Sequence, residues 1–240
     1  MNESSAASRV GLLVPSSDIT LECELYKTLP ENVELHVARM PLGKVTPENL
    51  ARMEEESTKA LTLIMDAEPH LIVYGCTSGS FIGGKGYDTK VEERITKLTG
   101  VRSITVAHAV VDALKALRVH TISVCTPYIE EINQVEKRFL SDSGFEVKSI
   151  YGMNIVRDID IGKLDPREVY SFASQHDDPH ADAMFISCTN VKTLGIIPRL
   201  RSMLSKPIVS SNLATLWKVC KHLNGEMRGS IFDDLRYASS

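Results

Sequence analysis

The chain has 240 residues, of which 43% are hydrophobic and 24% are charged, the balance of an ordinary globular protein with enough length to bury a sizeable core. Its formal net charge of −4 gives no reason to expect nucleic acid or an anionic membrane as a partner. No apolar run approaches the roughly 20 residues that span a bilayer, and the polar start Met1–Ser8 lacks the apolar segment of a signal peptide. We therefore expect a cytoplasmic protein with a frayed N-terminal tail.

The first half of the chain alternates short apolar runs with amphipathic segments. Pro30 ends the first helix, and Thr46 followed by Pro47 begins the second, because proline suits the first helical position. The sequence predicts strands at 10–14, 33–40, 71–75 and 103–106, with helices at 19–29, 46–67 and 85–98 and a last helix ending at 117.

The same alternation begins again at Thr121, and Asp165 followed by Pro166 marks another helix start. The sequence predicts strands at 121–124, 145–151, 183–187 and 207–210, with helices at 129–142, from 165, at 194–204 and at 213–223. Because each strand is followed by a helix, the strands of each half are expected to be parallel.

The two halves also share an internal repeat. Pro15 precedes Cys76 by 61 positions, and Pro127 precedes Cys188 by the same 61 positions. The segment 43–50 matches 162–169 at an offset of 119 rather than 112, which indicates a seven-residue insertion in the second copy that is balanced later. Three matches in the same order predict a duplicated βαβαβαβα unit.

The predicted fold class is therefore α/β, with two pseudo-symmetric Rossmann-like or flavodoxin-like domains, each a parallel sheet flanked by helices. We expect residues 1–112 plus 213–240 to form the first domain, including a returning C-terminal helix, and residues 113–212 to form the second. The active site should lie in the cleft between them, since ligands bind beyond the carboxyl ends of parallel strands.

The cysteines do not form the pattern of a disulfide framework, because they are odd in number and widely scattered. Pro179 lies between His176 and His180, which argues against a helix that presents both rings to a zinc ion. We therefore expect no metal and no cofactor. Three of the five cysteines are predicted to be buried and chemically inert. These three are Cys23, Cys125 and Cys220.

Cys76 and Cys188 differ from the other cysteines because each directly follows a buried strand, at 71–75 and 183–187. A strand end next to a helix start offers free backbone N–H groups that stabilise a thiolate and bind carboxylates. Two thiols on opposite sides of a substrate can exchange protons at a carbon, which racemises it. Alternatively, one thiolate adds to an activated C=C bond and allows rotation. We expect Cys76 and Cys188 to be catalytic.

Either reaction places negative charge on a substrate carboxylate, so hydrogen-bond donors must converge there. Five residues next to the strand ends supply suitable hydroxyl and amide groups. They are Thr77, Ser78, Tyr128, Thr189 and Asn190.

At these residues the sequence resembles the aspartate/glutamate racemase superfamily, and within it the maleate cis–trans isomerase and arylmalonate decarboxylase branch. The resemblance is carried by five segments, which are 11–17, 75–78, 126–129, 187–190 and 207–212, together with Trp217. It implies two pseudo-symmetric domains, a buried cleft for a small carboxylate substrate, no cofactor, and a homodimer or higher homo-oligomer.

The resemblance also implies roles for individual residues. Cys76 would be the nucleophile, Cys188 its acid–base partner, and Tyr128 would hold a carboxylate. Decarboxylases of the branch are similar but carry glycine where this chain has Cys76, so the paired cysteines favour an isomerase or racemase. Two alternatives stay open, an arylmalonate-type decarboxylase that uses Cys188 and a non-catalytic protein that binds small carboxylates.

Two positions depart from the maleate isomerase pattern. Asp18, which follows Ser17 after the first strand, and Asp158 stand where those enzymes have asparagine. We expect Ser17, Asp18 and Asp158 to contact substrate. The alternative for Asp18 is that it only caps a helix, a common role of aspartate. If both acids face the cleft, they would repel a second substrate carboxylate, and an amino group would suit the site better.

Overall fold

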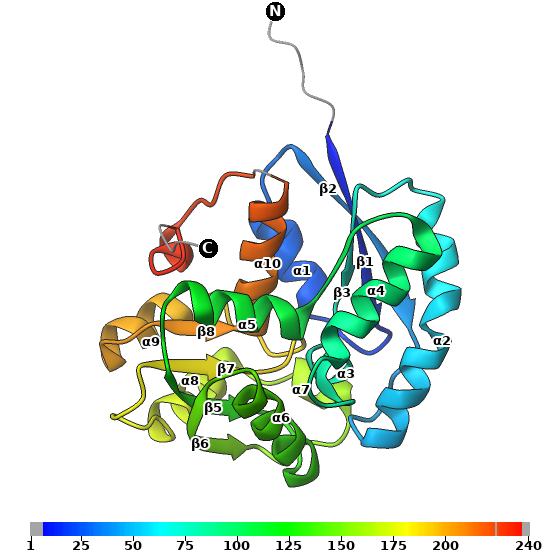
Figure 1. Ribbon diagram of the computed structural model, residues 1–240. Helices are drawn as coiled ribbons and strands as arrows, with labels where there is room; N and C mark the ends of the chain where they lie inside the picture. The colour runs from blue at the N-terminus through cyan, green and yellow to red at the C-terminus, as the bar shows by residue number, and fades with distance from the viewer. Residues whose placement is uncertain (1–6, 224, 237–240) are drawn as a thin grey trace, which may run out of the picture.

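The structure is a computed structural model that describes residues 7–223 and 225–236. It contains two four-stranded parallel sheets, with strand orders β2-β1-β3-β4 and β6-β5-β7-β8. Helices flank both sheets, and the chain passes from one half to the other as Figure 1 shows. This confirms the predicted α/β class with two similar parallel-sheet units. The predicted N-terminal tail lies mostly at residues 1–6, outside the described residues.

The first half follows the predicted order, with one short helix that the sequence analysis missed, α3. Its elements are β1 (Ser8–Pro15), α1 (Leu21–Thr28), β2 (Val33–Met40), α2 (Pro47–Met65), β3 (Leu71–Tyr74), α3 (Thr77–Phe81), α4 (Tyr87–Thr99), β4 (Ser103–Thr105) and α5 (Val106–Ala116).

The second half adds another short helix, α7, and the last element among the described residues is a 3₁₀ turn. Its elements are β5 (Thr121–Thr126), α6 (Glu130–Asp142), β6 (Glu146–Gly152), α7 (Asp158–Gly162), α8 (Pro166–Gln175), β7 (Ala183–Ile186), α9 (Ile197–Leu204), β8 (Ile208–Ser210), α10 (Ser211–His222) and η1 (Ser230–Phe232).

The sequence repeat corresponds to a structural one. α2 and α8 begin at Pro47 and Pro166, in the same place after the second strand of each sheet. The connection to α8 covers residues 153–165, whereas the connection to α2 covers only 41–46, so the seven extra residues lie there and include α7. The insertion therefore brings Asp158, which no residue of the first half matches, to the end of the second sheet.

Backbone hydrogen bonds between this longer connection and the shorter one of the first half join the two halves. Val45 donates its N–H to the carbonyl of Val156 at 2.8 Å, and Asp158 donates to the carbonyl of Gly43 at 3.1 Å. α10 follows the last strand of the second sheet yet packs against α5 and α1, as Figure 1 also shows. The assignment of this helix to the first domain and the domain limits stay predictions.

The central strands β3 and β7 are buried along their whole length, which explains why they read as continuous apolar runs. The apolar core extends through both halves. Across the described residues, the structure contains no helix that is both long and apolar enough to cross a membrane.

Candidate active site

Cys76 lies at the end of β3 and forms the N-cap of α3. Its sulfur accepts a hydrogen bond from the N–H of Gly79 at 3.4 Å and lies 3.8 Å from the hydroxyl oxygen of Ser78. Gly75, between β3 and Cys76, packs closely against β1. A side chain would not fit there, because a Cβ would come within 2.9 Å of the Leu13 carbonyl oxygen. Burial raises the pKa of the Cys76 thiol to about 12, although the Gly79 N–H opposes the shift. The resting group is therefore a thiol, and the N–H of Gly79 at the start of α3 would stabilise its anion.

Cys188 lies two residues beyond β7 and has a backbone φ of 89°, in the left-handed region that side chains rarely adopt. Burial raises its pKa well above the usual value, and the charge of Asp158 adds to that rise. The N–H of Asn190 acts in the opposite direction. Strained backbone of this kind collects at functional sites, where the surrounding structure holds it in place.

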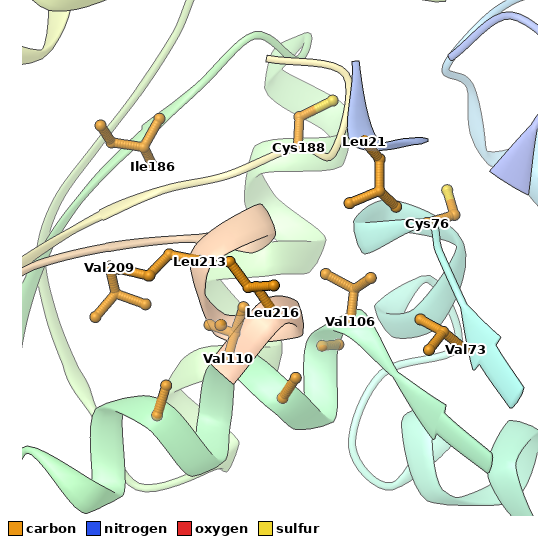
Figure 2. Packing of buried hydrophobic residues seen from close by; sticks show 14 of the residues in the cluster. Leu21, Val73, Cys76, Val106, Val110, Ile186, Cys188, Val209, Leu213 and Leu216 are labelled. Carbon is orange, nitrogen blue, oxygen red and sulfur yellow. The ribbon is translucent and has the colours of Figure 1, made fainter. Parts of the chain in front are cut away.

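The two cysteine segments meet through Ser211, the first residue of α10, which the sequence analysis missed. Its buried hydroxyl oxygen accepts hydrogen bonds from the hydroxyl of Thr77 at 2.9 Å and from the N–H of Cys188 at 3.1 Å. Figure 2 shows Cys76 and Cys188 on either side of Leu21, with their sulfur atoms directed away from the aliphatic cluster below. Both side chains are buried, at 4% and 5% exposure, so the site is closed.

Tyr128 follows β5 and contributes a free donor. Its hydroxyl is buried and meets no hydrogen-bond partner among the described side chains and backbone. Phe81 packs its ring edge-on against the tyrosine, with centroids 6.4 Å apart. Burial raises the pKa of Tyr128 well above its usual value, and negative charge on Cys188, Glu136 and Cys76 would add to that rise. A substrate carboxylate between the thiols could accept a hydrogen bond from this phenol.

Asp18 is a buried carboxyl group that binds backbone N–H groups at the start of α1. Oδ1 accepts hydrogen bonds from the N–H groups of Thr20 at 2.8 Å and Leu21 at 2.9 Å. Oδ2 has no hydrogen-bond partner in the part of the chain that the structure describes, and the residue is 0% exposed. The pKa of Asp18 is raised to about 7, chiefly by burial and in part by the charge of Asp158, while the N–H groups of Thr20 and Leu21 and the side chain of Thr189 oppose the rise. The helix-capping interpretation accounts for Oδ1, and contact of this carboxyl group with substrate stays a prediction.

Asp158, Ser17 and Asn190 form a hydrogen-bonded group across the two halves. Asp158 Oδ2 accepts from the Ser17 hydroxyl at 2.7 Å and from the Asn190 amide at 3.1 Å, while Asn190 Oδ1 accepts from the N–H of Ile19. Burial raises the pKa of Asp158, and these two bonds lower it. Ser17 and Asn190 therefore already use their polar groups to hold the carboxylate of Asp158, and Thr77 likewise uses its hydroxyl on Ser211.

The other cysteines are only partly as expected. Cys125 and Cys220 are buried, but Cys23 is exposed, so the prediction for that residue was wrong. It lies on the outer side of α1, where the apolar face is set by Leu21 and Leu25. Within residues 7–223 and 225–236, no three His, Cys, Asp or Glu side chains come together as metal ligands would.

A buried polar residue on α6, Glu136, was also missed. It is 1% exposed, and its Oε1 accepts a hydrogen bond from the hydroxyl of Ser187 at 2.6 Å, immediately before Cys188. The sequence did carry a signal, because Glu136 lies on the same helical face as Ile132 and Phe139, both buried.

Comparison with known proteins gives one consistent answer. A maleate isomerase of Geobacillus stearothermophilus is 29% identical over 230 residues, which cover 90% of this chain and 92% of the relative. A solved maleate isomerase variant of Pseudomonas putida S16 with maleate matches with a TM-score of 0.89 and 26% identity, over 95% of this chain and 98% of the other.

The Nocardia farcinica maleate cis–trans isomerase, solved as a cysteine-to-serine variant with a covalently bound succinylcysteine intermediate, matches with a TM-score of 0.88 and 25% identity. That match covers 94% of this chain and 98% of the other. A family model described as arylmalonate decarboxylase matches residues 10–231. These matches confirm the branch expected from the motifs, and the chain belongs to the arylmalonate decarboxylase family.

Proposed function

We propose that the protein is a cofactor-independent cis–trans isomerase of a small unsaturated carboxylate, with Cys76 as nucleophile and Cys188 as acid–base partner. The observation that carries the proposal is the pair of buried thiols at equivalent strand ends, joined through Ser211. The relatives named maleate isomerase support the same reaction class. Both cysteines are present, which favours isomerisation over a decarboxylation that needs Cys188 alone.

The reaction follows from the chemistry of these groups. The sulfur of Cys76 adds as the thiolate to a C=C bond conjugated with a carboxylate, and Cys188, which burial keeps as a thiol, can give its proton to the neighbouring carbon. The former double bond then rotates as a single bond. Negative charge develops on the carboxylate, where the unpartnered hydroxyl of Tyr128 donates a hydrogen bond. Expulsion of Cys76 as the thiolate, with the proton on carbon returned to Cys188, releases the trans isomer.

The substrate's charge is set by Asp18 and Asp158. Both are buried, and no cation is among the groups that shift their pKa values. A second substrate carboxylate would face both acids, whereas an ammonium or another donor could pair with Asp18 Oδ2. We therefore propose an amino-bearing or donor-rich carboxylate as the preferred substrate. Efficient isomerisation of maleate by the wild-type protein would contradict this preference.

The reaction class is tested by NMR of the protein with a panel of mono- and dicarboxylates in D2O. A cis–trans product supports the proposal, with or without solvent deuterium beside the carboxylate. Loss of CO2 as the only reaction would favour the decarboxylase alternative. Saturable binding with no turnover of any compound would favour a binding protein. A cytoplasmic location and a homo-oligomeric state are further proposals, and gel filtration with light scattering tests the second.

A further inference from the structure

A cavity of about 580 Å³ lies between the C-terminal ends of α5 and α10, two helices that pack against each other (Figure 1). Its lining residues on both helices fall in the last two turns, and Arg102, directly before β4, also lines it. α10 has 12 residues and is therefore about 18 Å long. Because its first residue, Ser211, belongs to the candidate active site, the cavity lies at the far end of the helix, away from the two cysteines.

Positive charge collects around this cavity, although the chain as a whole has a formal net charge of −4. Arg102, Lys115 and Lys221 all line it, and all three are exposed. Among the residues that the structure describes, no carboxylate lies within ion-pair distance of any of these three side chains. Three unpaired cations therefore share one space, where they repel one another.

The acid that lines the same cavity is already paired. Asp112 on α5 forms an ion pair with Lys218 of α10, and its Oδ2 also lies 3.6 Å from Nε2 of His108. Burial lowers the pKa of His222, another lining residue, and the charges of Arg102 and Lys218 lower it further. An anion in the cavity would thus meet a positive field, with no unpaired acid among the lining residues to oppose it.

The helix ends explain part of this arrangement. Lys115 and Lys221 stand in the last turns of α5 and α10, where a cation interacts favourably with the helix dipole. This effect accounts for a lysine at each helix end. It does not account for Arg102, which comes from a different segment, or for the open space that all three cations share. A ligand of opposite charge accounts for both.

The size and charge of the cavity decide between possible occupants. Its volume lies within the range of roughly 300–1,000 Å³ that is typical of small-molecule sites. A second copy of the chain is a poor occupant, since a two-fold interface on this face would bring the same cations of both copies together. A phosphate monoester carries about two negative charges near pH 7 and three acceptor oxygens, one for each unpaired cation.

We propose that the cavity between α5 and α10 binds the phosphate group of a small phosphorylated molecule, at a site separate from the active site. Arg102 holds two phosphate oxygens with its planar fork, and Lys115 and Lys221 act as point charges. Trp217, whose ring centroid lies 4.9 Å from Nζ of Lys221, forms part of the wall. This site is independent of the proposed isomerase reaction.

Trp217 is the one tryptophan in the sequence, so its fluorescence reports directly on the cavity. Titration of the full-length protein with glycerol 3-phosphate should give a saturable change, because the phosphate draws the Lys221 ammonium away from the ring. Glycerol with sodium chloride at the same ionic strength should give none. Succinate, a dianion without the phosphate group, should change the fluorescence only at concentrations about tenfold higher or more.

Variants assign the binding to individual residues. Arg102→Gln leaves Trp217 and Lys221 in place and should weaken the binding of glycerol 3-phosphate about tenfold or more, because it removes a bidentate, charge-assisted contact. The double variant Lys115→Gln, Lys221→Gln should weaken binding at least as much. Isothermal titration calorimetry measures its affinity, since loss of Lys221 by itself alters the tryptophan fluorescence.

The matched control is the double variant Lys59→Gln, Lys163→Gln, which removes two exposed lysines that do not line the cavity. It should keep the affinity of the wild type, and circular dichroism checks the fold of every variant. If the double cavity variant fails to fold, Arg102→Gln carries the test alone.

Three results would overturn the proposed site. They are no saturable change with glycerol 3-phosphate, an equal loss of affinity in the control and cavity variants, and binding of succinate as tight as that of glycerol 3-phosphate. None of these measurements needs turnover, so failure here is distinct from failure to find an isomerase activity.

Discussion

The two strand ends that carry the cysteines occupy equivalent places but offer different chemistry. Cys76 caps a short helix in relaxed backbone geometry, with φ of −141°, and receives the N–H of Gly79. Cys188 is held at a φ of 89° and gives its own N–H to Ser211. The first arrangement stabilises an attacking thiolate, whereas the second fixes the position of a sulfur.

The side chains near the two thiols also differ between the halves. After its first strand, the first half supplies a carboxyl group, Asp18, while the second half supplies a phenol, Tyr128. Ser187, which precedes Cys188, donates its hydroxyl to Glu136, and the equivalent Gly75 has no side chain. The internal repeat therefore accounts for the equivalent positions, and the different neighbouring groups fit the separate roles that we propose for the two cysteines.

The largest expected effect comes from removing the sulfur of Cys76. Cys76→Ser should lower turnover by roughly 10³-fold or more, because a serine hydroxyl is a far weaker nucleophile at neutral pH. The fold should persist, since the change is nearly isosteric, and circular dichroism with a thermal melt checks this. Near-normal turnover in a folded Cys76→Ser protein would remove that thiol from the mechanism.

The phenol on the side of Cys188 should have the next largest effect. Tyr128→Phe should lower kcat/KM by about 10- to 1,000-fold, on the order of 1.5–4 kcal/mol, because a donor in a dry site strengthens as charge develops on the carboxylate. Steady-state kinetics measures the change. An unaltered kcat/KM would show that the hydroxyl points away from the substrate.

Asp18 should make stability depend on pH. Its pKa is about 7 in the folded protein and 3.8 ordinarily, so between these values the folded state binds more protons than the unfolded state. The free energy of unfolding then falls as pH rises from about 4 to 7. Asp18→Asn keeps an acceptor for Thr20 and Leu21 and should raise stability at pH 8 by on the order of 2–4 kcal/mol relative to pH 4.

Urea unfolding of the wild type and of Asp18→Asn at the two pH values measures this difference. Asp165→Asn is a suitable control, because Asp165 is an exposed helix cap whose pKa is lowered by Arg167. An equal effect of Asp18→Asn at pH 4 and pH 8 would mean that the buried carboxyl is paired.

The smallest effect concerns backbone strain. At position 188, replacing Ala by Gly should raise stability by about 1 kcal/mol, because the left-handed conformation costs a Cβ-bearing residue that much. At position 76 the same replacement should be neutral or destabilising, since the backbone there is extended. Thermal melts measure the stability difference between alanine and glycine at each position, with the variants Cys188→Ala, Cys188→Gly, Cys76→Ala and Cys76→Gly. Equal differences at the two positions would contradict backbone strain specific to position 188.

Much of the fold could be predicted from the sequence, because buried parallel strands such as β3 and β7 are continuous apolar runs and prolines mark the starts of α2 and α8. The five-residue helices α3 and α7 were missed because they are too short to show periodicity. Cys23 was misjudged for a related reason, since the sequence shows a helix but places the edge of its buried face only roughly.

The sequence is enough to predict which strand ends carry the candidate site. Cys76, Cys188 and Tyr128 stand there in sequence as well as in space. The hydrogen bonds that occupy Thr77, Ser17 and Asn190 depend on contacts between distant segments, and so do the hydrogen bonds of Ser211 and Glu136. Hydroxyl and amide side chains near a site have the same sequence signature whether they hold the substrate or hold each other.

The most direct test of the unequal roles is intact-protein and peptide mass spectrometry of Cys188→Ser after incubation with a substrate found by NMR. This variant keeps the proposed nucleophile and lacks its acid–base partner, so a covalent adduct with the mass of the substrate should accumulate on Cys76. Cys76→Ser should form no adduct. An adduct on Cys188 in the Cys76→Ser protein, with none on Cys76 in the other variant, would contradict the assignment.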